Sequence, residues 1–378
     1  MTLATPKIVV LDSATLMKVS HDYWDQDACA RDKARSFITR LQYLGVFVTF
    51  TKTHIVELLR HGDGQVVQDR LRFLHSIPLI AWLRPYDRSW FPGDITDLLT
   101  RELHVMVHGS ARNWREIVDA VRPELWETGM GSEMFVVNEE FWANISCESH
   151  HLHEKEKYTA SMARTDPGQI SDVKLSEVLH LPIRLKEERG AYMRRFAKEM
   201  QRQLEQHGDK RFDYSHKAAI DLANSTLQDV KTIDEMGGNP IQRLLESVNV
   251  PLDLVSPEMT CGELGELAVY AKRLKMISKS LRPPIELTMR DVPQDTLPSY
   301  VLERKLASIQ RKAERVSGSD LGDRHIAPLI FYADGIEVDK RTCEFLNQVR
   351  RNEPKLASLM GRFFPSSDYS QIPKFFDE

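Results

Sequence analysis

Short apolar runs alternate with amphipathic segments at the beginning of the chain. Residues 7–11 (KIVVL) and 46–50 (VFVTF) are apolar and rich in β-branched side chains, which predicts two buried strands of a parallel sheet. Between them, apolar side chains recur on one helical face from about residue 28 to residue 44, and Gly45 can cap that helix. The hydroxyl side chains of Thr51 and Thr53 can cap a second helix. The order strand, helix, strand, helix predicts a right-handed α/β unit.

A long, charged and mainly helical stretch follows. It extends from about residue 84 to residue 313, and several prolines mark irregular connections within it. Helices are predicted near residues 95–107, 114–121, 133–145, 185–206, 216–230, 240–247 and 262–279. This stretch therefore differs in kind from the α/β unit that precedes it.

The α/β pattern returns after Gly318. It comprises two short apolar runs, a helix and a candidate last strand, at residues 329–331, 335–338, 342–350 and 363–375. We therefore predict an α/β core made of residues 1–83 and 315–378. A helical insertion of residues 84–314 separates the two parts of that core in the sequence.

Composition narrows the class of protein. Hydrophobic residues make up 42% of the 378 residues and charged residues 28%, which is typical of a soluble globular protein. The net charge is −4, so binding of nucleic acid would need a local basic surface. The four cysteines are far apart, which argues against a zinc site or disulfides and predicts a reducing cytoplasm. No apolar run is long enough to cross a bilayer, so we expect no membrane partner.

Acidic residues stand where an α/β protein binds its ligands. Asp12 follows the first predicted strand and Asp339 follows a later one, and ligands in open α/β sheets bind beyond the carboxyl ends of strands. Glu57 lies in the first turns of the helix after the second strand. Asp320 and Asp323 begin another predicted helix, where their i, i+3 spacing places both carboxylates near its N-terminal end.

Such gathered carboxylates indicate a cation site. Like charges that lie close together raise each other's pKa unless a cation offsets them. Mg²⁺ and Mn²⁺ prefer hard oxygen ligands, which carboxylates supply. One or two such ions can activate water and orient a phosphodiester for in-line displacement. The predicted cofactor is therefore Mg²⁺ or Mn²⁺.

Three segments of the chain resemble the motifs of PIN-domain nucleases. KIVVLDSATL, which contains Asp12, resembles the opening strand of that family with its first aspartate. THIVELLRHGD, which contains Glu57, resembles its helix with a central glutamate. SDLGDRHIAPLIFYADGIEVDKRT resembles its C-terminal motif, with an acidic helix start and a terminal acid before a basic residue. The resemblance covers residues 1–83 and roughly the last 60 residues, and it leaves out the middle.

The resemblance implies a PIN-like parallel-sheet sandwich with a large inserted α-helical domain. It implies that Asp12, Glu57, Asp323 and Asp339 are catalytic metal ligands and that Asp320 assists them as a fifth catalytic acid. The implied activity is a metal-dependent hydrolysis of phosphodiester bonds that leaves a 5′-phosphate and a 3′-hydroxyl. RNA is the expected substrate because most PIN-like proteins cut it.

Each candidate site residue also has a simpler structural interpretation. The acids can also serve as helix caps, turn residues or solvated surface charges. Asp334 is interpreted as a turn residue before a glycine, and His54 and His325 as structural histidines. The HHLH run at 150–153 lacks a zinc-ligand spacing.

Basic residues offer contacts for a nucleic acid. One pair lies beside the expected acidic site, where a scissile phosphate would come close. A second group lies among aromatic residues of the insertion, but interleaved glutamates make a salt-bridged helix the simpler interpretation. A third group is less diluted by acids. The candidate contacts are Lys340, Arg341, Arg194, Arg195, Lys272 and Arg273.

The sequence thus predicts a metal-dependent ribonuclease whose insertion is a lid, a substrate platform or a homodimer surface. The main alternative is a catalytically inactive PIN-like scaffold that binds protein or nucleic acid, because one fold hosts many functions. A small-molecule phosphatase that uses the same acids is a third interpretation.

Overall fold

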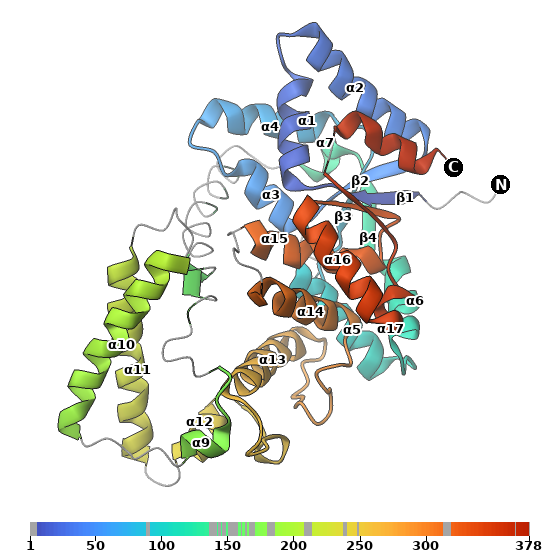
Figure 1. The fold of residues 1–378 in the computed structure, drawn as a ribbon. Coiled ribbons are helices and arrows are strands. Elements are labelled where there is room, and N and C mark those ends of the chain that lie inside the picture. The colour runs from blue at the N-terminus through green and yellow to red at the C-terminus, as the bar shows by residue number, and fades with distance from the viewer. Residues whose placement is uncertain are drawn as a thin grey trace. The chain divides into compact units, whose positions relative to one another are not determined.

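The computed structural model shows two compact units (Figure 1). It describes residues 6–87, 91–135, 171–179, 186–207, 214–236, 240–247, 249–312, 319–366 and 368–377, with isolated positions between 142 and 165. The first unit, called the sheet unit below, comprises residues 1–153, 295–312 and 319–378. The second, called the helical unit, comprises residues 154–294 and 313–318.

A six-stranded sheet forms the centre of the sheet unit. Its strands are β1 (Lys7–Val10), β2 (Val46–Phe50), β3 (Ile80–Leu83), β4 (Trp126–Gly129), β5 (Gly335–Val338) and β6 (Arg362–Pro365). They lie in the order β4-β3-β2-β1-β5-β6, and all neighbours are parallel except β3 and β4. The fold is therefore mixed α/β with a mostly parallel sheet, as the apolar runs predict.

The central strand β1 joins the beginning of the chain to its end. Val9 pairs with Val48 of β2 on one side and with Gly335 of β5 on the other. The carboxylate of Asp334 accepts a hydrogen bond from the backbone N–H of Ile8 at 2.7 Å, so this predicted turn residue also extends the pairing of β1 with β5. Strands with two buried neighbours and helices on both faces explain the continuous apolar runs in the sequence.

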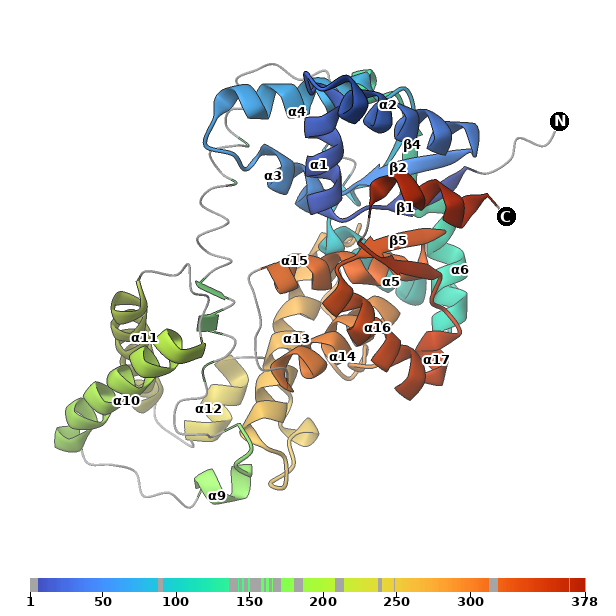
Figure 2. The same cartoon turned by 45° about the horizontal axis from the view of Figure 1, so that its top comes forward.

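One set of helices packs against β1 and β2 in a hydrophobic core that contains side chains such as Val9, Phe37, Ile55, Phe73 and Ile372. These helices are α1 (Ser13–Tyr23), α2 (Ala28–Tyr43), α3 (Lys52–Leu59), α4 (Gly64–Ser76), α7 (Gly131–Met134) and the 3₁₀ helix η3 (Tyr369–Phe376). Figure 2 shows α1 to α4 together on one side of the sheet.

A second set of helices lies on the other side of the sheet (Figure 2). It comprises α5 (Ile95–His108), α6 (Trp114–Leu125), α14 (Pro298–Lys312), α15 (Ser319–Ile326), η2 (Ala327–Phe331), α16 (Lys340–Asn352) and α17 (Pro354–Ala357). The sequence prediction placed α5, α6 and the segment of α14 in the insertion, whereas contacts place them in the sheet unit. The compact units thus divide the chain differently from the predicted boundaries after residues 83 and 314.

Local chemistry explains where several elements begin and end. Thr51 caps α3, since its side chain accepts from the backbone N–H of His54. Gly45 follows α2 with a φ of 65°, a left-handed conformation that glycine adopts without cost. The predicted last strand at 363–375 is only partly present, because β6 ends at Pro365 and the following residues form η3.

The helical unit comprises α9 (Leu175–Leu179), α10 (Lys186–His207), α11 (Ser215–Met236), α12 (Pro240–Ser247), η1 (Leu252–Leu254) and α13 (Cys261–Ser280). Helices α10 and α11 pack through Met200, Leu204, Ala218 and Ala219. The helix predicted at 133–145 and the HHLH run lie largely outside the described residues. In the part of the chain that the structure describes, no helix is both long and apolar enough to cross a membrane.

Candidate functional site

The two strands β1 and β5 mark a switch point in the sheet. From β1 the chain continues to β2 and β3 on one side, whereas β5 and then β6 lie on the other side. Ligand sites of open α/β sheets lie beyond the carboxyl ends of the strands at such a point. Asp12 stands just after β1 and Asp339 directly after β5, so two of the predicted acids occupy this position. We call it the acidic edge.

Asp12 is held by three separate contacts. One carboxylate oxygen accepts from the backbone N–H of Ala14 at 3.1 Å, which makes Asp12 the N-cap of α1. The other oxygen accepts from the hydroxyl of Ser366 at 3.0 Å. The backbone N–H of Asp12 donates to a carboxylate oxygen of Glu337 at 3.2 Å. The side chain is thus fixed in direction while it remains partly accessible.

Glu337 is an acidic residue at this edge that the sequence analysis did not select. It lies in β5 and is only 1% exposed. Besides the bond from Asp12, it accepts a hydrogen bond from the hydroxyl of Thr15 at 2.9 Å. The sequence offers one indication of this role, which is a single acid inside the otherwise apolar strand GIEV. A buried carboxylate seldom occurs without hydrogen-bond partners, so such an acid points to a specific set of contacts.

Ser366 connects the ends of three strands. It follows β6, and its backbone N–H donates to the carbonyl oxygen of Val338 at 2.7 Å. Its hydroxyl lies 3.1 Å from that same carbonyl oxygen and 3.0 Å from the carboxylate of Asp12. The carboxyl ends of β1, β5 and β6 are therefore linked at one point.

Asp339 and Asp323 meet through a shared threonine. Asp339 caps α16, accepting from the backbone N–H of Thr342 at 2.5 Å. The buried hydroxyl of Thr342 points to the carboxylate of Asp323 on α15, at a distance of 3.5 Å. The acid after β5 and the acid on α15 thus contact the same residue.

The side chain of Glu57 on α3 lies close to α15. A methyl group placed on Gly322 would lie 3.0 Å from a carboxylate oxygen of Glu57, so a larger residue at this position would make Glu57 shift by a few tenths of an ångström. Gly322 is the direct neighbour of Asp323. The structure therefore brings Asp12, Glu57, Asp323 and Asp339 to one edge, whereas the side chain of Asp320 lies outside the described part.

A buried histidine contacts the strand end that carries Asp12. His54 is fully buried, and its Nε2 lies 2.9 Å from the carbonyl oxygen of Leu11. The backbone N–H of Thr51 donates to its Nδ1 at 3.0 Å, so the proton of the neutral ring is on Nε2. Burial lowers the pKa of His54 to about 4, which outweighs the bond to Leu11. His54 is therefore a satisfied structural histidine, as the sequence indicated.

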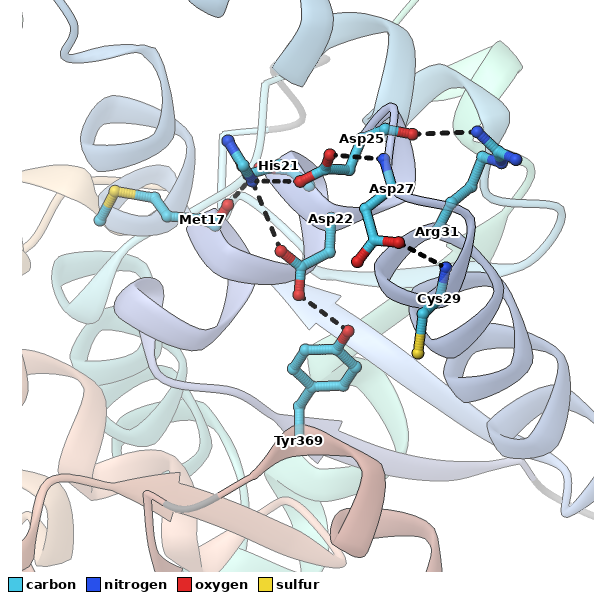
Figure 3. A network of polar contacts seen from close by, with 9 residues as sticks. Met17, His21, Asp22, Asp25, Asp27, Cys29, Arg31 and Tyr369 are labelled. Atoms are coloured by element: carbon cyan, nitrogen blue, oxygen red, sulfur yellow. Dashed lines mark hydrogen bonds and ion pairs between the residues drawn. The ribbon is translucent and has the colours of Figure 1, made fainter.

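The acids of the edge do not form a closed three-ligand group. Among the described side chains, one group of three has potential ligand atoms within 4.8 Å of one another, and it is His21, Asp22 and Asp25 at the end of α1 (Figure 3). Asp22 also accepts from the hydroxyl of Tyr369 at 2.9 Å, and His21 is 75% exposed. These contacts join α1 to η3 and account for the group as an ion-pair cluster.

The candidate basic residues divide between the two units. Lys340 and Arg341 open α16 in the sheet unit, directly after Asp339, and Arg341 lies over the ring of Phe345 at 5.5 Å. The other four lie on helices of the helical unit: Arg194 and Arg195 on α10, Lys272 and Arg273 on α13. An ion pair between Arg202 and Glu199 on α10 fits the salt-bridged helix that the sequence suggested.

Comparisons with known proteins identify no relative of this chain. No protein-family model matches the chain, no curated protein matches it, and no solved structure matches it.

Proposed function

We propose that this protein is a metal-dependent nuclease that hydrolyses phosphodiester bonds, with RNA as its preferred substrate. The observation that carries the proposal is the acidic edge at the switch point of the sheet. Asp12 and Asp339 follow the two neighbouring strands at that point, β1 and β5, while Glu57 lies close to α15 and Asp323 contacts the same threonine as Asp339. The resemblance of these segments to PIN-domain nucleases supports the same activity.

The donor set of the edge fits Mg²⁺ or Mn²⁺, because its side chains offer carboxylate and hydroxyl oxygens. Such an ion, when bound, would lower the pKa of a water molecule and neutralise charge on a phosphate. The chain supplies the orientation: Ser366 holds one oxygen of Asp12, and Thr342 contacts both Asp339 and Asp323. Supporting contacts of this kind orient ligands and affect metal affinity.

Two cations stand beside these acids. Lys340 and Arg341 are in the first turn of α16, next to Asp339. A phosphate that approaches the edge would therefore meet positive charge, and a guanidinium can bind two phosphate oxygens at once. Their role in this proposal is to hold the scissile phosphate against the acids.

The test is cleavage of labelled single-stranded RNA and DNA by the purified protein, with Mn²⁺, with Mg²⁺ and with EDTA. We expect cleavage that needs the metal and falls at least about 100-fold in Asp12→Asn and Asp323→Asn. Asp25→Asn is the matched control, because Asp25 belongs to the ion-pair cluster at the end of α1 and not to the edge. If both edge variants cut as fast as the unaltered protein, the site assignment is wrong.

A non-catalytic scaffold is the second candidate, and one observation favours it. Asp12 and Asp339 both cap helices, which is a sufficient structural reason for each acid. A scaffold would show no cleavage with any divalent metal, and alanine at Asp12, Glu57, Asp323 and Asp339 would leave partner binding intact. Turnover of a small phosphate ester without cleavage of oligonucleotides would instead indicate a phosphatase.

The thiols of Cys29 and Cys343 are not joined in a disulfide, which fits a reducing compartment, and we propose a cytoplasmic location. The helical unit would then serve as a lid, an RNA platform or a homodimer surface.

A further inference from the structure

A basic and aromatic hollow lies beside the outer strand of the sheet. Strand β6 is an edge strand, paired with β5 on one side. A hollow of about 590 Å³ is lined by residues of β6 together with the last turn of α16 and the end of η3. Its volume is in the range of ligand sites in proteins. We call it the β6 hollow.

The charge of the β6 hollow is positive. Its lining includes Arg350 from α16, Arg362 from β6 and Lys374 from η3, and all three are exposed. None of the described residues that line it is acidic, although the whole chain has a net charge of −4. Two of the cations are held in place, since Arg350 donates to the carbonyl oxygen of Gly361 and Arg362 donates to that of Phe375.

Aromatic rings lie between these cations. The guanidinium of Arg350 is 4.2 Å from the ring centre of Phe363. Phe375 stacks on Phe364 with ring centres 4.4 Å apart and is nevertheless 41% exposed. Surfaces that bind single-stranded nucleic acid combine cations for the phosphates with aromatic faces for the bases. The lining of the hollow contains both kinds of group.

The β6 hollow is connected to the acidic edge by the strand itself. Strand β6 ends at Pro365, and the next residue, Ser366, donates to the carboxylate of Asp12. The four residue steps from Arg362 to Ser366 span about 13 Å, since a strand rises about 3.3 Å per residue. Stacked nucleotides advance by about 3.4 Å, so roughly four of them cover this distance.

We propose that the β6 hollow binds single-stranded nucleic acid and leads it along β6 to the acidic edge. The phosphates lie against Arg350, Arg362 and Lys374, and a base stacks on the exposed face of Phe375. This inference names the substrate of the proposed nuclease and in that respect rests on the proposed function. The binding surface itself needs no metal and can be tested without turnover.

Cations on an edge strand also have a simpler role, which is to prevent that strand from pairing with strands of other molecules. An edge strand of this kind can instead pair with an extended peptide. Neither role requires an aromatic ring that is stacked and left exposed. The substitution of Phe375 therefore separates nucleic-acid binding from both.

The experiment measures binding of a short labelled single strand by fluorescence anisotropy in EDTA. The probes are RNA, DNA of the same sequence and the corresponding duplex. The variants are Lys374→Glu and Phe375→Ala, and the matched controls are Lys355→Glu on α17 and Tyr43→Ala on α2. Tyr43 is 81% exposed and Lys355 is exposed too, so both controls change an accessible side chain of the same unit.

We expect each hollow variant to weaken binding of a single strand roughly 5- to 100-fold, which is the effect of losing one stacked base or one phosphate contact. The salt dependence of binding becomes less steep in Lys374→Glu, and the controls bind as the unaltered protein does. Preference for RNA over DNA, or equal binding of both, supports the proposal. Binding of the duplex alone overturns it, as does unchanged binding by the variants.

Cleavage assays keep this inference separate from the proposed function. If the protein cuts RNA and Lys374→Glu and Phe375→Ala leave KM unchanged, the hollow is not the substrate site although the nuclease assignment stands. If the variants lose binding but no metal supports cleavage, the hollow stands and the nuclease assignment fails. Thermal melting of each variant, followed by circular dichroism, confirms that the fold is intact.

Discussion

The Nε2 of His54 lies 2.9 Å from the carbonyl oxygen of Leu11, the residue that precedes Asp12. This bond joins the beginning of α3 to the end of β1, across 43 positions of sequence. Glu57 lies less than one helical turn after His54 on the same helix. A single neutral imidazole therefore fixes the two chain segments that present the first two acids of the edge.

Protonation of His54 is expected to destabilise the fold at acidic pH. Burial holds its pKa at about 4 in the folded protein, against an ordinary value of 6.5. The unfolded chain thus binds the proton more tightly, so this contribution is complete above pH 6.5 and is lost as the pH falls towards 4. At about 1.4 kcal/mol for each pH unit between the two values, the loss is about 3 kcal/mol.

Urea unfolding across this pH range checks the effect in the unaltered protein and in His54→Gln. The variant should be less stable than the unaltered protein at neutral pH, and this difference in the free energy of unfolding should shrink as the pH falls towards 4. The control is His61→Gln, because His61 is exposed just after α3. A variant with the same acid sensitivity as the unaltered protein would show that another group is responsible.

Gly322→Ala should separate activity from stability. The new methyl group would lie 3.0 Å from the carboxylate of Glu57 and shift that carboxylate by a few tenths of an ångström. Alanine in a helix is about 1 kcal/mol more favourable than glycine, so the stability of the sheet unit should not fall. Metal-dependent cleavage should decrease roughly 10- to 100-fold, because small displacements of site groups are costly.

The matched control for this change is Gly265→Ala in α13, where the added methyl group would have nothing within 4 Å. It should show the same gain in helix stability with unchanged cleavage. Full activity in Gly322→Ala, measured at saturating Mn²⁺, would argue that Glu57 takes no part in the reaction.

In the proposed nuclease, Ser366→Ala should lower the affinity of the acidic edge for Mn²⁺. The variant removes the hydroxyl that donates to Asp12 at 3.0 Å, and the loss of such a supporting contact reduces metal affinity or activity roughly 10- to 100-fold. The fold should lose only about 1 kcal/mol. The decisive measurement is the dependence of the cleavage rate on Mn²⁺ concentration, which should shift to higher concentration. Ser366→Thr, which keeps a hydroxyl, should restore part of the affinity.

The sequence was sufficient to locate residues whose position depends on local pattern. Asp12 and Asp339 follow apolar runs that form β1 and β5, and Thr51 caps α3 as its place before the helix indicated. The parallel order of strands then brings the carboxyl ends together without further information. Each of these features is determined by residues that are close together in the sequence.

Other parts depend on contacts that no local pattern reveals. Glu337 and Ser366 bond with the segment around Asp12 across more than 300 positions of sequence, so their role emerges only from the pairing of β1 with β5 and β6. Helix α1 was not predicted because hydroxyl residues, among them Ser13 and Thr15, occupy its buried face. Thr15 is buried because its hydroxyl donates to Glu337, which is itself a long-range contact.

Glu102→Gln should stabilise the protein at alkaline pH. Glu102 is fully buried on α5 and accepts hydrogen bonds from the hydroxyls of Ser299 and Tyr332, both at 2.5 Å. Burial raises its pKa to about 7 from an ordinary 4.5, and these bonds only partly oppose that effect. The folded protein thus holds the proton more tightly than the unfolded chain. This contribution to stability is complete below pH 4.5, and about 3 kcal/mol is lost as the pH rises through 7.

Glutamine at position 102 stays neutral and keeps an oxygen for the two hydroxyls, so Glu102→Gln should not show this loss of stability. The control is Glu124→Gln at an exposed site of α6, which should lose stability as the unaltered protein does.

The effects of Glu102 and His54 have opposite signs over nearly the same range of pH. Stability from His54 rises between pH 4 and 6.5, whereas stability from Glu102 falls between pH 4.5 and 7. The two slopes offset each other in the unaltered protein, so its urea midpoint should change little between pH 4.5 and 6.5. His54→Gln should reveal the falling slope alone, and Glu102→Gln the rising slope alone. Unfolding curves of the two variants that slope in the same direction would contradict the assignment of these two groups as opposing buried titrations.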